Sequence, residues 1–159
     1  RPENEKGLWN VPNLLLQKFP AEEFTATTKL KFTPRTNNEE TGFLVMGEDY
    51  QYISLKRTDD KLFIRVVECK KARTGGEETE VYLEEINSNE IYFRIKVEKG
   101  ALCKFSFSTD GKKYTQVGPA FEAKPGRWIG AKTGFFALRE GITNDSGTVD
   151  IDWFRVEKN

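Results

Sequence analysis

The chain has 159 residues, of which 25 are basic and 25 acidic, so its formal net charge at pH 7 is zero. This length suits one domain that can bury a core without metal or disulfide support. Because the opposite charges are scattered, no basic stripe is available to follow nucleic-acid phosphates or an anionic membrane surface. No apolar run approaches the roughly 20 residues that span a bilayer, and no signal-peptide pattern opens the chain, so we expect a soluble domain with neither nucleic acid nor membrane as a partner.

The residue types that are absent restrict the chemistry. The sequence contains no histidine, which removes the commonest general base and metal ligand together with every Ser-His-Asp or Cys-His scheme. Only carboxylate, lysine or tyrosine chemistry remains. The two cysteines, Cys69 and Cys103, lack CxxC spacing, which disfavours a zinc site. They are either free and buried or joined in one disulfide, so the compartment stays open.

Strand signals dominate the chain once the polar opening is passed. Residues 1–7 (RPENEKG) are expected to be a flexible segment or a cut point in a longer polypeptide, and residues 8–159 one domain. Helix signals are nearly absent. Short strand-like runs separated by turn residues lie at 13–19, 24–32, 41–47, 49–57, 61–69, 80–86, 90–98, 102–108, 133–140 and 148–156.

Two of these runs alternate clearly between apolar and polar residues. In residues 24–32 the apolar face carries Phe24, Leu30 and Phe32, and in residues 91–97 it carries Ile91 and Phe93. Such a period of two predicts strands with one face in the core and one in water.

The connections between the runs are equally informative. The TDGK sequence at residues 109–112 predicts a hairpin turn, since Asp and Gly tolerate the positive φ that tight turns need. Residues 68–80 (ECKKARTGGEETE) read as a solvated loop or hairpin tip, and no GxxxxGK motif makes them a phosphate loop. About ten short strands without crossover helices predict an all-β fold, an antiparallel two-sheet sandwich or jelly roll.

Catalysis would have to rest on the closing strand, where Asp150 and Asp152 lie two positions apart. Such residues share a strand face about 6.6 Å apart, which permits an acid pair like that of retaining glycosidases. The E-x-D-x-x-E strand of laminarinase-type sandwich enzymes is missing. The two aspartates are otherwise a metal-binding or hydrogen-bonding feature, or the solvated face of an edge strand.

Aromatic residues provide the case for binding. Ile53 and Leu55 define the apolar face of residues 49–57, so Tyr50 and Tyr52 are expected on the polar face near water. Phenol rings beside hydrogen-bonding groups suit the C–H faces and hydroxyls of sugars. The competing interpretation is that they are ordinary cross-strand aromatics covering the sheet.

The three tryptophans have different settings. Trp9 lies among turn residues, where it either packs on the domain or meets a ligand. Trp128, in the glycine-rich run KPGRWIGAKTG, caps the core or lines a loop-borne sugar site. Trp153 shares a predicted strand face with Val149 and Ile151, which predicts a core position.

The order of several motifs gives a more specific clue. The segments NLLLQKFPAEEFTATTKLKF, TGFLVMGEDYQYISL, FSFSTDGKKYTQVG, GRWIGAKTGFFALREG and GTVDIDWFRV together resemble the C-terminal β-sandwich domain of family 43 glycoside hydrolases, the β-xylosidase and arabinofuranosidase group. The match runs from Leu8 to Val156. It implies a concanavalin A-like jelly roll that follows a five-bladed catalytic propeller, is not catalytic itself, and braces the active site or, in some members, binds xylan.

The resemblance also offers a role for the closing aspartates. In the family and in related sandwiches an aspartate on the last strand helps to hold a structural calcium ion, and the matching residues are Asp150 and Asp152. Calcium takes six to eight oxygen ligands, so other strands must contribute. The aspartate-rich opening strand with a D-D-F motif is missing here.

We therefore expect a non-catalytic accessory module of a secreted or periplasmic polysaccharide-degrading enzyme. Its partners would be a propeller catalytic domain of the same polypeptide and a plant-cell-wall polysaccharide such as xylan or arabinoxylan, bound through Tyr50, Tyr52, Trp9 and Trp128. Two alternatives are a purely structural interaction domain and a self-sufficient glycosidase that uses Asp150 and Asp152.

Overall fold

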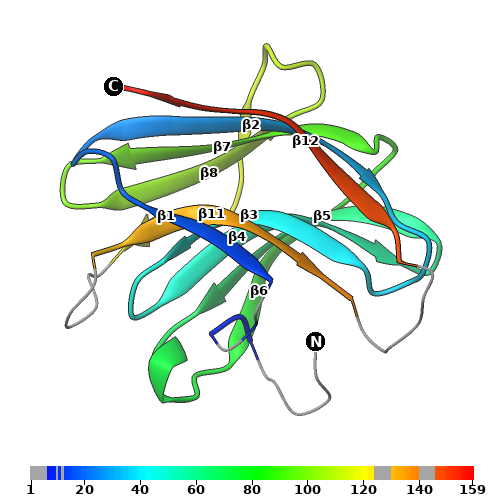
Figure 1. The fold of residues 1–159 in the computed structure, drawn as a ribbon, viewed down its shortest axis with the longest axis horizontal. Helices are drawn as coiled ribbons and strands as arrows, with labels where there is room; N and C mark the ends of the chain where they lie inside the picture. Colours follow the sequence, from blue (N-terminus) through cyan, green and yellow to red (C-terminus); the bar gives the residue numbers. More distant parts are fainter. Residues whose placement is uncertain (1–6, 10, 12, 124–129, 140–145) are drawn as a thin grey trace.

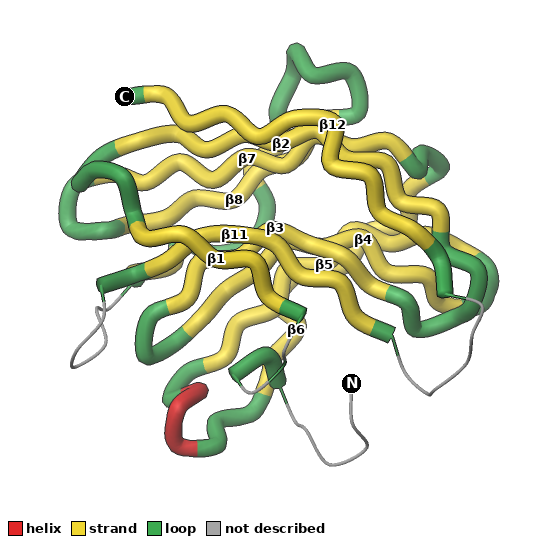
Figure 2. The backbone as a smooth tube through the Cα atoms, in the orientation of Figure 1, coloured by secondary structure: helices red, strands yellow, loops and turns green. Residues whose placement is uncertain are grey.

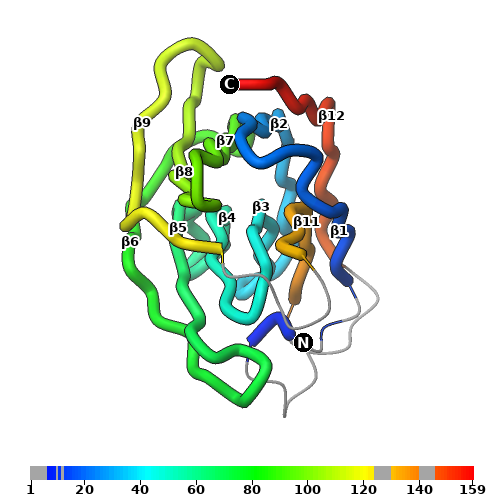
Figure 3. The backbone as a smooth tube through the Cα atoms, turned by 90° about the vertical axis from the view of Figure 1, so that its left-hand side faces the viewer, coloured from blue at the N-terminus to red at the C-terminus, as the bar shows by residue number. Residues whose placement is uncertain are grey.

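The computed structural model describes residues 7–9, 11, 13–123, 130–139 and 146–159. These residues form two antiparallel sheets that face each other, as Figure 1 and the side view in Figure 3 show. Sheet A, the lower one in Figure 1, has the order β1 (Leu14–Lys18), β11 (Lys132–Leu138), β3 (Glu40–Met46), β4 (Tyr50–Thr58), β5 (Lys61–Cys69) and β6 (Glu78–Ile86). Sheet B has the order β10 (Phe121–Glu122), β8 (Leu102–Ser108), β7 (Glu90–Glu98), β2 (Phe24–Thr33) and β12 (Thr148–Glu157), with β9 (Thr115–Gln116) paired to β8.

The predicted all-β sandwich is thus confirmed, and each of the ten expected strands is present. In the described part of the chain the helical content is one 3-10 turn, η1 (Ala72–Thr74), inside the loop predicted at residues 68–80. Figure 2 shows this turn at the tip of the β5–β6 connection. No helix in the described segments is long and apolar enough to cross a membrane.

The main core lies between the sheets and follows the predicted alternation. Phe24, Leu30 and Phe32 of β2 and Ile91 and Phe93 of β7 are all buried there. The side chains from sheet A that meet them are Phe43, Val45, Ile53, Leu55, Ile64 and Val66. Fully burying one such apolar side chain contributes about 1.5–3 kcal/mol, so this layer is the main source of stability.

The predicted TDGK turn joins β8 to β9. Gly111 has φ +73°, and Asp110 Oδ1 accepts bonds from the Lys112 and Lys113 N–H groups at 2.8 and 3.0 Å. These backbone donors lower the pKa of Asp110 to about 2. Six residues separate β8 from β9, so the connection is longer than a two-residue hairpin. The Asp110 side chain caps this loop by accepting two backbone hydrogen bonds.

A β-bulge interrupts β12 at Asp152. Ile151 pairs with Leu30 and Trp153 with the preceding Lys29, so one residue of β12 has no partner. A bulge reverses the alternation beyond it, and Phe154 consequently packs toward the core on the same side as Val149. The prediction of a core position for Trp153 is therefore wrong: its ring lies on the outer face of sheet B, 6.1 Å from Tyr92.

Glu39 connects the β2–β3 loop to the start of β12. Its carboxylate accepts bonds from the N–H groups of Arg35 at 2.6 Å, Thr36 at 3.3 Å and Gly147 at 2.7 Å. Burial acts to raise the pKa of Glu39, but the three N–H donors outweigh it and the pKa lies below its ordinary value. The carboxylate therefore ties together two segments far apart in the chain.

We predict that Glu39→Gln lowers the free energy of unfolding by about 1–3 kcal/mol at pH 7, because charge-assisted bonds to backbone donors are weakened. Since the folded-state pKa is depressed, the wild-type advantage exists above the ordinary pKa of 4.5 and disappears as the pH falls through the folded value. Urea unfolding at pH 7 and pH 3 measures both effects. The exposed Glu22→Gln variant is the control, and equal losses in the two variants would contradict the prediction.

Candidate functional site

A second apolar cluster covers the face of sheet A that points away from sheet B. Its residues are Leu8, Val11, Leu44, Tyr50, Tyr52, Val67, Cys69, Ala72, Phe136 and Leu138. Leu8 and Val11 come from the segment before β1, which lies beneath sheet A in Figure 1. Strands β3 and β4 are consequently buried on both faces.

The two tyrosines predicted to face solvent belong to this cluster. Their alternation was predicted correctly, because Ile53 and Leu55 point into the main core and Tyr50 and Tyr52 do not. The prediction that they face solvent is wrong, since Tyr50 is 0% and Tyr52 1% exposed. The rings lie 6.3 Å apart, and Tyr52 meets Phe136 edge to face at 4.8 Å. Neither ring is therefore available for sugar stacking in this structure.

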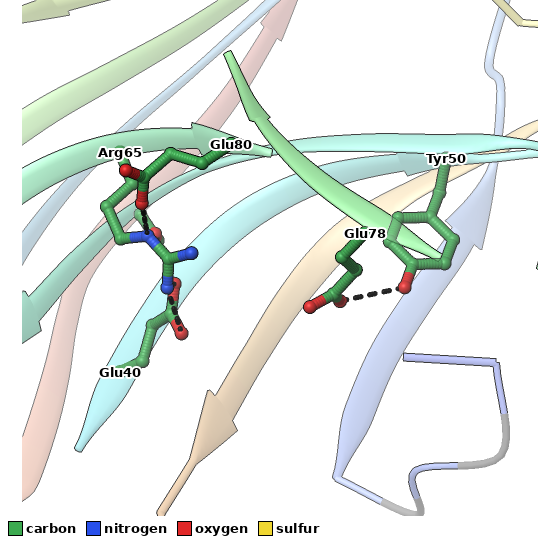
Figure 4. Close-up of polar contacts among 6 residues, drawn as sticks. Glu40, Tyr50, Arg65, Glu78 and Glu80 are labelled. Carbon is green, nitrogen blue, oxygen red and sulfur yellow. Dashed lines mark hydrogen bonds and ion pairs between the residues drawn. The ribbon is translucent and has the colours of Figure 1, made fainter. Parts of the chain in front are cut away.

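Tyr50 holds the covering segment by its hydroxyl group. The Leu8 N–H donates to Tyr50 Oη at 2.8 Å, and the hydroxyl donates to Glu78 Oε1 at 2.8 Å (Figure 4). A Cβ on Gly7 would lie 2.6 Å from that oxygen, and Gly7 has φ +102°, so only glycine fits. Burial, and then the nearby Glu78 charge, raise the pKa of Tyr50 well above its ordinary value. The phenol is a neutral structural link.

We predict that Tyr50→Phe costs about 1–3 kcal/mol in unfolding free energy, because the Leu8 N–H loses its acceptor in a buried place. Residues 7–11 should also become faster to cleave in limited proteolysis. Tyr82→Phe is the matched control, since its hydroxyl donates to Glu84 at the surface. A Tyr50→Phe protein as stable and protease-resistant as the control would contradict this role.

A polar cluster lies beside the tyrosines on the same face of sheet A. It consists of Glu40, Ser54, Arg65 and Glu80, from β3, β4, β5 and β6 (Figure 4). Arg65 Nη1 donates to both Glu40 oxygens at 3.2 Å and Nε to Glu80 at 2.7 Å, while the Ser54 hydroxyl donates to Glu40 at 2.6 Å. This cluster was not predicted from the sequence, although the alternation of FIRVV places Arg65 between the apolar Phe63 and Val67 on one strand face.

The charges in this cluster are strongly desolvated. The side chains of Glu40 and Arg65 are 7% and 15% exposed. Burial raises the pKa of Glu40, and Arg65 and Ser54 oppose that shift. The Arg65 guanidinium binds two carboxylates, so the cluster links β5 to β3 and β6. Within the cluster neither Glu40 nor Ser54 is free to act as a base or nucleophile.

We predict that Arg65→Met lowers the unfolding free energy by about 3–5 kcal/mol at pH 7, because Glu40 is left as an uncompensated buried charge. A carboxyl group whose folded-state pKa is raised contributes to the unfolding free energy a term that is lost as the pH rises through that pKa. The loss should therefore be smaller at pH 5, where Glu40 is more readily protonated.

Urea unfolding of the wild type and the variant at both pH values tests this expectation. Lys61→Met is the control, since Lys61 forms an exposed pair with Glu85 that should contribute less than about 1 kcal/mol. A loss of unfolding free energy that is independent of pH, or no larger than that of the control, would show that Arg65 does not stabilise the buried Glu40 carboxylate.

The closing aspartates are not arranged as a free acid pair. Asp152 lies in the bulge and forms an ion pair with Lys29 at 3.2 Å, and the register places Asp150 opposite Lys31. The described residues contain no group of three or more acidic or cysteine side chains that could hold a metal ion. Calcium at Asp150 and Asp152 stays a prediction.

The remaining predicted residues lie in separate places. Trp9 is half-buried and packs on the outer cluster of sheet A, and Trp128 falls outside the described residues. Both cysteines are free and buried, Cys69 in the outer cluster and Cys103 in the main core. Burial raises the pKa of Cys103 to about 12, so its thiol is unreactive.

Two surface hollows lie near the edge strands β1 and β12. One of about 300 Å³ is lined by Glu39, Leu138, Arg139, Gly147 and Val149, among others. The other, of about 270 Å³, is mainly apolar and includes Leu15 and Ile151, which are 69% and 40% exposed. The first hollow is also lined by Glu40 of the polar cluster, and neither hollow is lined by Tyr50 or Tyr52.

The fold and its two cores define the class of this protein. Two facing antiparallel sheets with short connections form a concanavalin A-like β-sandwich. A family model described as "Beta xylosidase C-terminal Concanavalin A-like domain" matches residues 2–157, so the chain belongs to this family of glycoside hydrolase family 43 (GH43) domains. The resemblance drawn from the sequence motifs is confirmed.

Several known proteins contain a similar domain. A "Beta-xylosidase" of Formosa agariphila is 24% identical over 156 residues, which cover 97% of this chain and 25% of that protein. A "Xylan 1,3-beta-xylosidase" of a Vibrio species is 28% identical over 155 residues, covering 89% of this chain and 28% of that protein. Among solved structures, a bifunctional GH43-CE protein of Bacteroides eggerthii superposes with a TM-score of 0.84 at 20% identity, covering 98% of this chain and 20% of that one. The chain thus spans about a quarter of the length of the two sequence relatives.

Proposed function

We propose that this chain is the non-catalytic accessory domain of a larger polysaccharide-degrading glycoside hydrolase. The observation that carries the proposal is the family match over residues 2–157 to a C-terminal domain, combined with relatives about four times as long. The catalytic groups would lie in a separate domain of the same polypeptide, for which the family resemblance implies a five-bladed propeller. The sandwich would brace that domain.

The names of the relatives support a substrate class. Two of them are named for xylosidase activity, and we infer that the complete enzyme acts on xylan or arabinoxylan outside the cytoplasm, as a secreted or periplasmic protein. The burial of Tyr50 and Tyr52 argues against glycan binding through these two rings.

The described residues also support the absence of catalysis in the sandwich itself. A glycosidase needs two carboxyl groups that flank a bound sugar, one able to donate a proton. Asp152 is paired with Lys29, and Glu40 is enclosed by Arg65 and Ser54. Each of these carboxylates is thus engaged by a cationic side chain of the chain itself.

We predict that the isolated chain does not hydrolyse aryl β-xylosides or α-arabinosides. The full-length polypeptide should hydrolyse one of them, and removal of residues 8–159 should reduce its activity or its soluble yield at least tenfold. Release of the aryl group measures turnover, and gel filtration measures soluble yield. The proposal fails if the isolated chain turns over substrate and Asp152→Asn abolishes this, or if the truncated enzyme is as active and soluble as the complete one.

A further inference from the structure

The outer face of sheet B carries partly exposed aromatic rings next to cationic side chains. Tyr92 and Arg94 of β7 point outward because their neighbours Ile91, Phe93 and Ile95 are buried in the main core. The bulge at Asp152 places Trp153 and Arg155 of β12 on the same face. We call Lys29, Tyr92, Arg94, Tyr114, Trp153 and Arg155 the outer platform.

The strand register arranges the platform in two adjacent rows. Tyr92, Lys29 and Trp153 are aligned across β7, β2 and β12. Although β2 lies between their strands, the two rings lean together to 6.1 Å at an angle of 56°. In the next row Arg94 and Arg155 flank Thr27, so their α-carbons are about 10 Å apart, two strand spacings.

Each arginine lies over an aromatic ring. The Arg94 guanidinium lies 3.5 Å from the centroid of the Tyr114 ring, and its Nε donates to Thr27 Oγ1 at 3.1 Å. The Arg155 guanidinium carbon lies 5.1 Å from the centroid of the Trp153 ring. Tyr114 comes from the β8–β9 connection, which rises above sheet B in Figure 1. Such stacking orients the planar fork and leaves its other N–H donors available.

Some cationic side chains on the outer face of sheet B form ion pairs with carboxylates and others do not. Lys29 is paired with Glu90 at 3.0 Å and Asp152 at 3.2 Å, and Lys96 and Lys104 share Glu98. Across the segments that the structure describes, Arg94 and Arg155 form no ion pair with a carboxylate. The platform therefore presents two oriented, uncompensated guanidinium groups beside apolar ring surface.

We propose that the outer platform binds a polysaccharide that carries uronic acid groups. The exposed parts of the Tyr92 and Trp153 rings would contact sugar C–H groups, and Arg94 and Arg155 would each bind a carboxylate by paired N–H donors. That the ligand is a polysaccharide rests on the proposed function. That it is acidic rests on the charges of the platform.

The charge density of the face favours this ligand over a nucleic acid. Glu90, Glu98 and Asp152 interrupt the cations, whereas duplex DNA carries one negative charge per about 1.7 Å. A polymer with widely spaced carboxylates matches two separate guanidinium groups and avoids the intervening acids.

The test compares one polymer in two forms. Glucuronoxylan is reduced chemically at its carboxyl groups, and affinity electrophoresis of the chain is run in the native and the reduced polymer. We expect the native polymer to bind at least tenfold more tightly, since hydrogen bonds between charged groups each contribute about tenfold or more. The preference should shrink at high salt.

Variants of the platform locate the site. Arg155→Met and Arg94→Met should each weaken binding to the acidic polymer about tenfold or more and change binding to the reduced polymer little. Arg155→Lys keeps the charge but not the planar fork, so it should restore only part of the affinity. Trp153→Leu should weaken binding to both polymers. Arg73→Met, an exposed change of equal charge in η1 beyond sheet A, is the control, and thermal unfolding confirms that each variant is folded.

Three results would overturn the proposal: equal binding to the two polymers, an equal loss for Arg73→Met, or tighter binding to single-stranded DNA than to glucuronoxylan. Absence of binding to any polymer would overturn it as well and would identify the platform as a purely structural array. The truncation experiment measures turnover of small aryl glycosides and soluble yield, neither of which requires polysaccharide binding, so the bracing role and the platform can fail separately.

Discussion

Strands β3 and β4 are buried on both faces, and the other features of sheet A depend on this double burial. Their inward side chains, such as Phe43 and Ile53, form the main core with sheet B, while Leu44 and Tyr52 project the other way. A sheet with apolar side chains on both faces must be covered on both. Leu8 and Val11 provide this cover. The Tyr50 hydroxyl accepts a hydrogen bond from the Leu8 N–H and donates one to Glu78. The same face contains Glu40 and Arg65, whose charges are tolerated because each is paired and hydrogen-bonded.

The two outward faces of the sandwich therefore have opposite characters. On the outer face of sheet A the rings of Tyr50 and Tyr52 are buried, and the charges of Arg65 and Glu40 are paired with each other. This face therefore contributes to the stability of the domain. On sheet B the rings of Tyr92 and Trp153 stay partly exposed, and two arginines lie over aromatic rings with no carboxylate partner among the described residues. The glycan site that we propose therefore lies on sheet B, where aromatic rings and guanidinium groups reach the surface.

The bulge at Asp152 is the local feature that creates the second surface. Without it, Trp153 would follow the alternation of Val149 and Ile151 and point toward the core. With it, the ring joins Tyr92, and the Asp152 carboxylate meets Lys29. The spacing of Asp150 and Asp152 suggested a catalytic or metal-binding pair. The structure gives Asp152 a structural role, because it occupies the extra position of the strand and forms an ion pair with Lys29 in the middle of the outer platform.

The sequence by itself determined the fold class, the ten main strands and which side chains of β2, β4 and β7 point into the main core, because a period of two is a local property of each strand. The motif order also determined the family. Only the tertiary structure decided which of the remaining faces meet water. Tyr50 and Tyr52 are covered by a segment about 40 residues earlier in the chain, a contact that alternation cannot reveal. Arg65 finds Glu40 and Glu80 on neighbouring strands, and Trp153 is turned outward by a one-residue register shift. In each case the deciding interaction joins residues far apart in the chain, and strand pairing or the packing of a distant segment, not local pattern, brings them together.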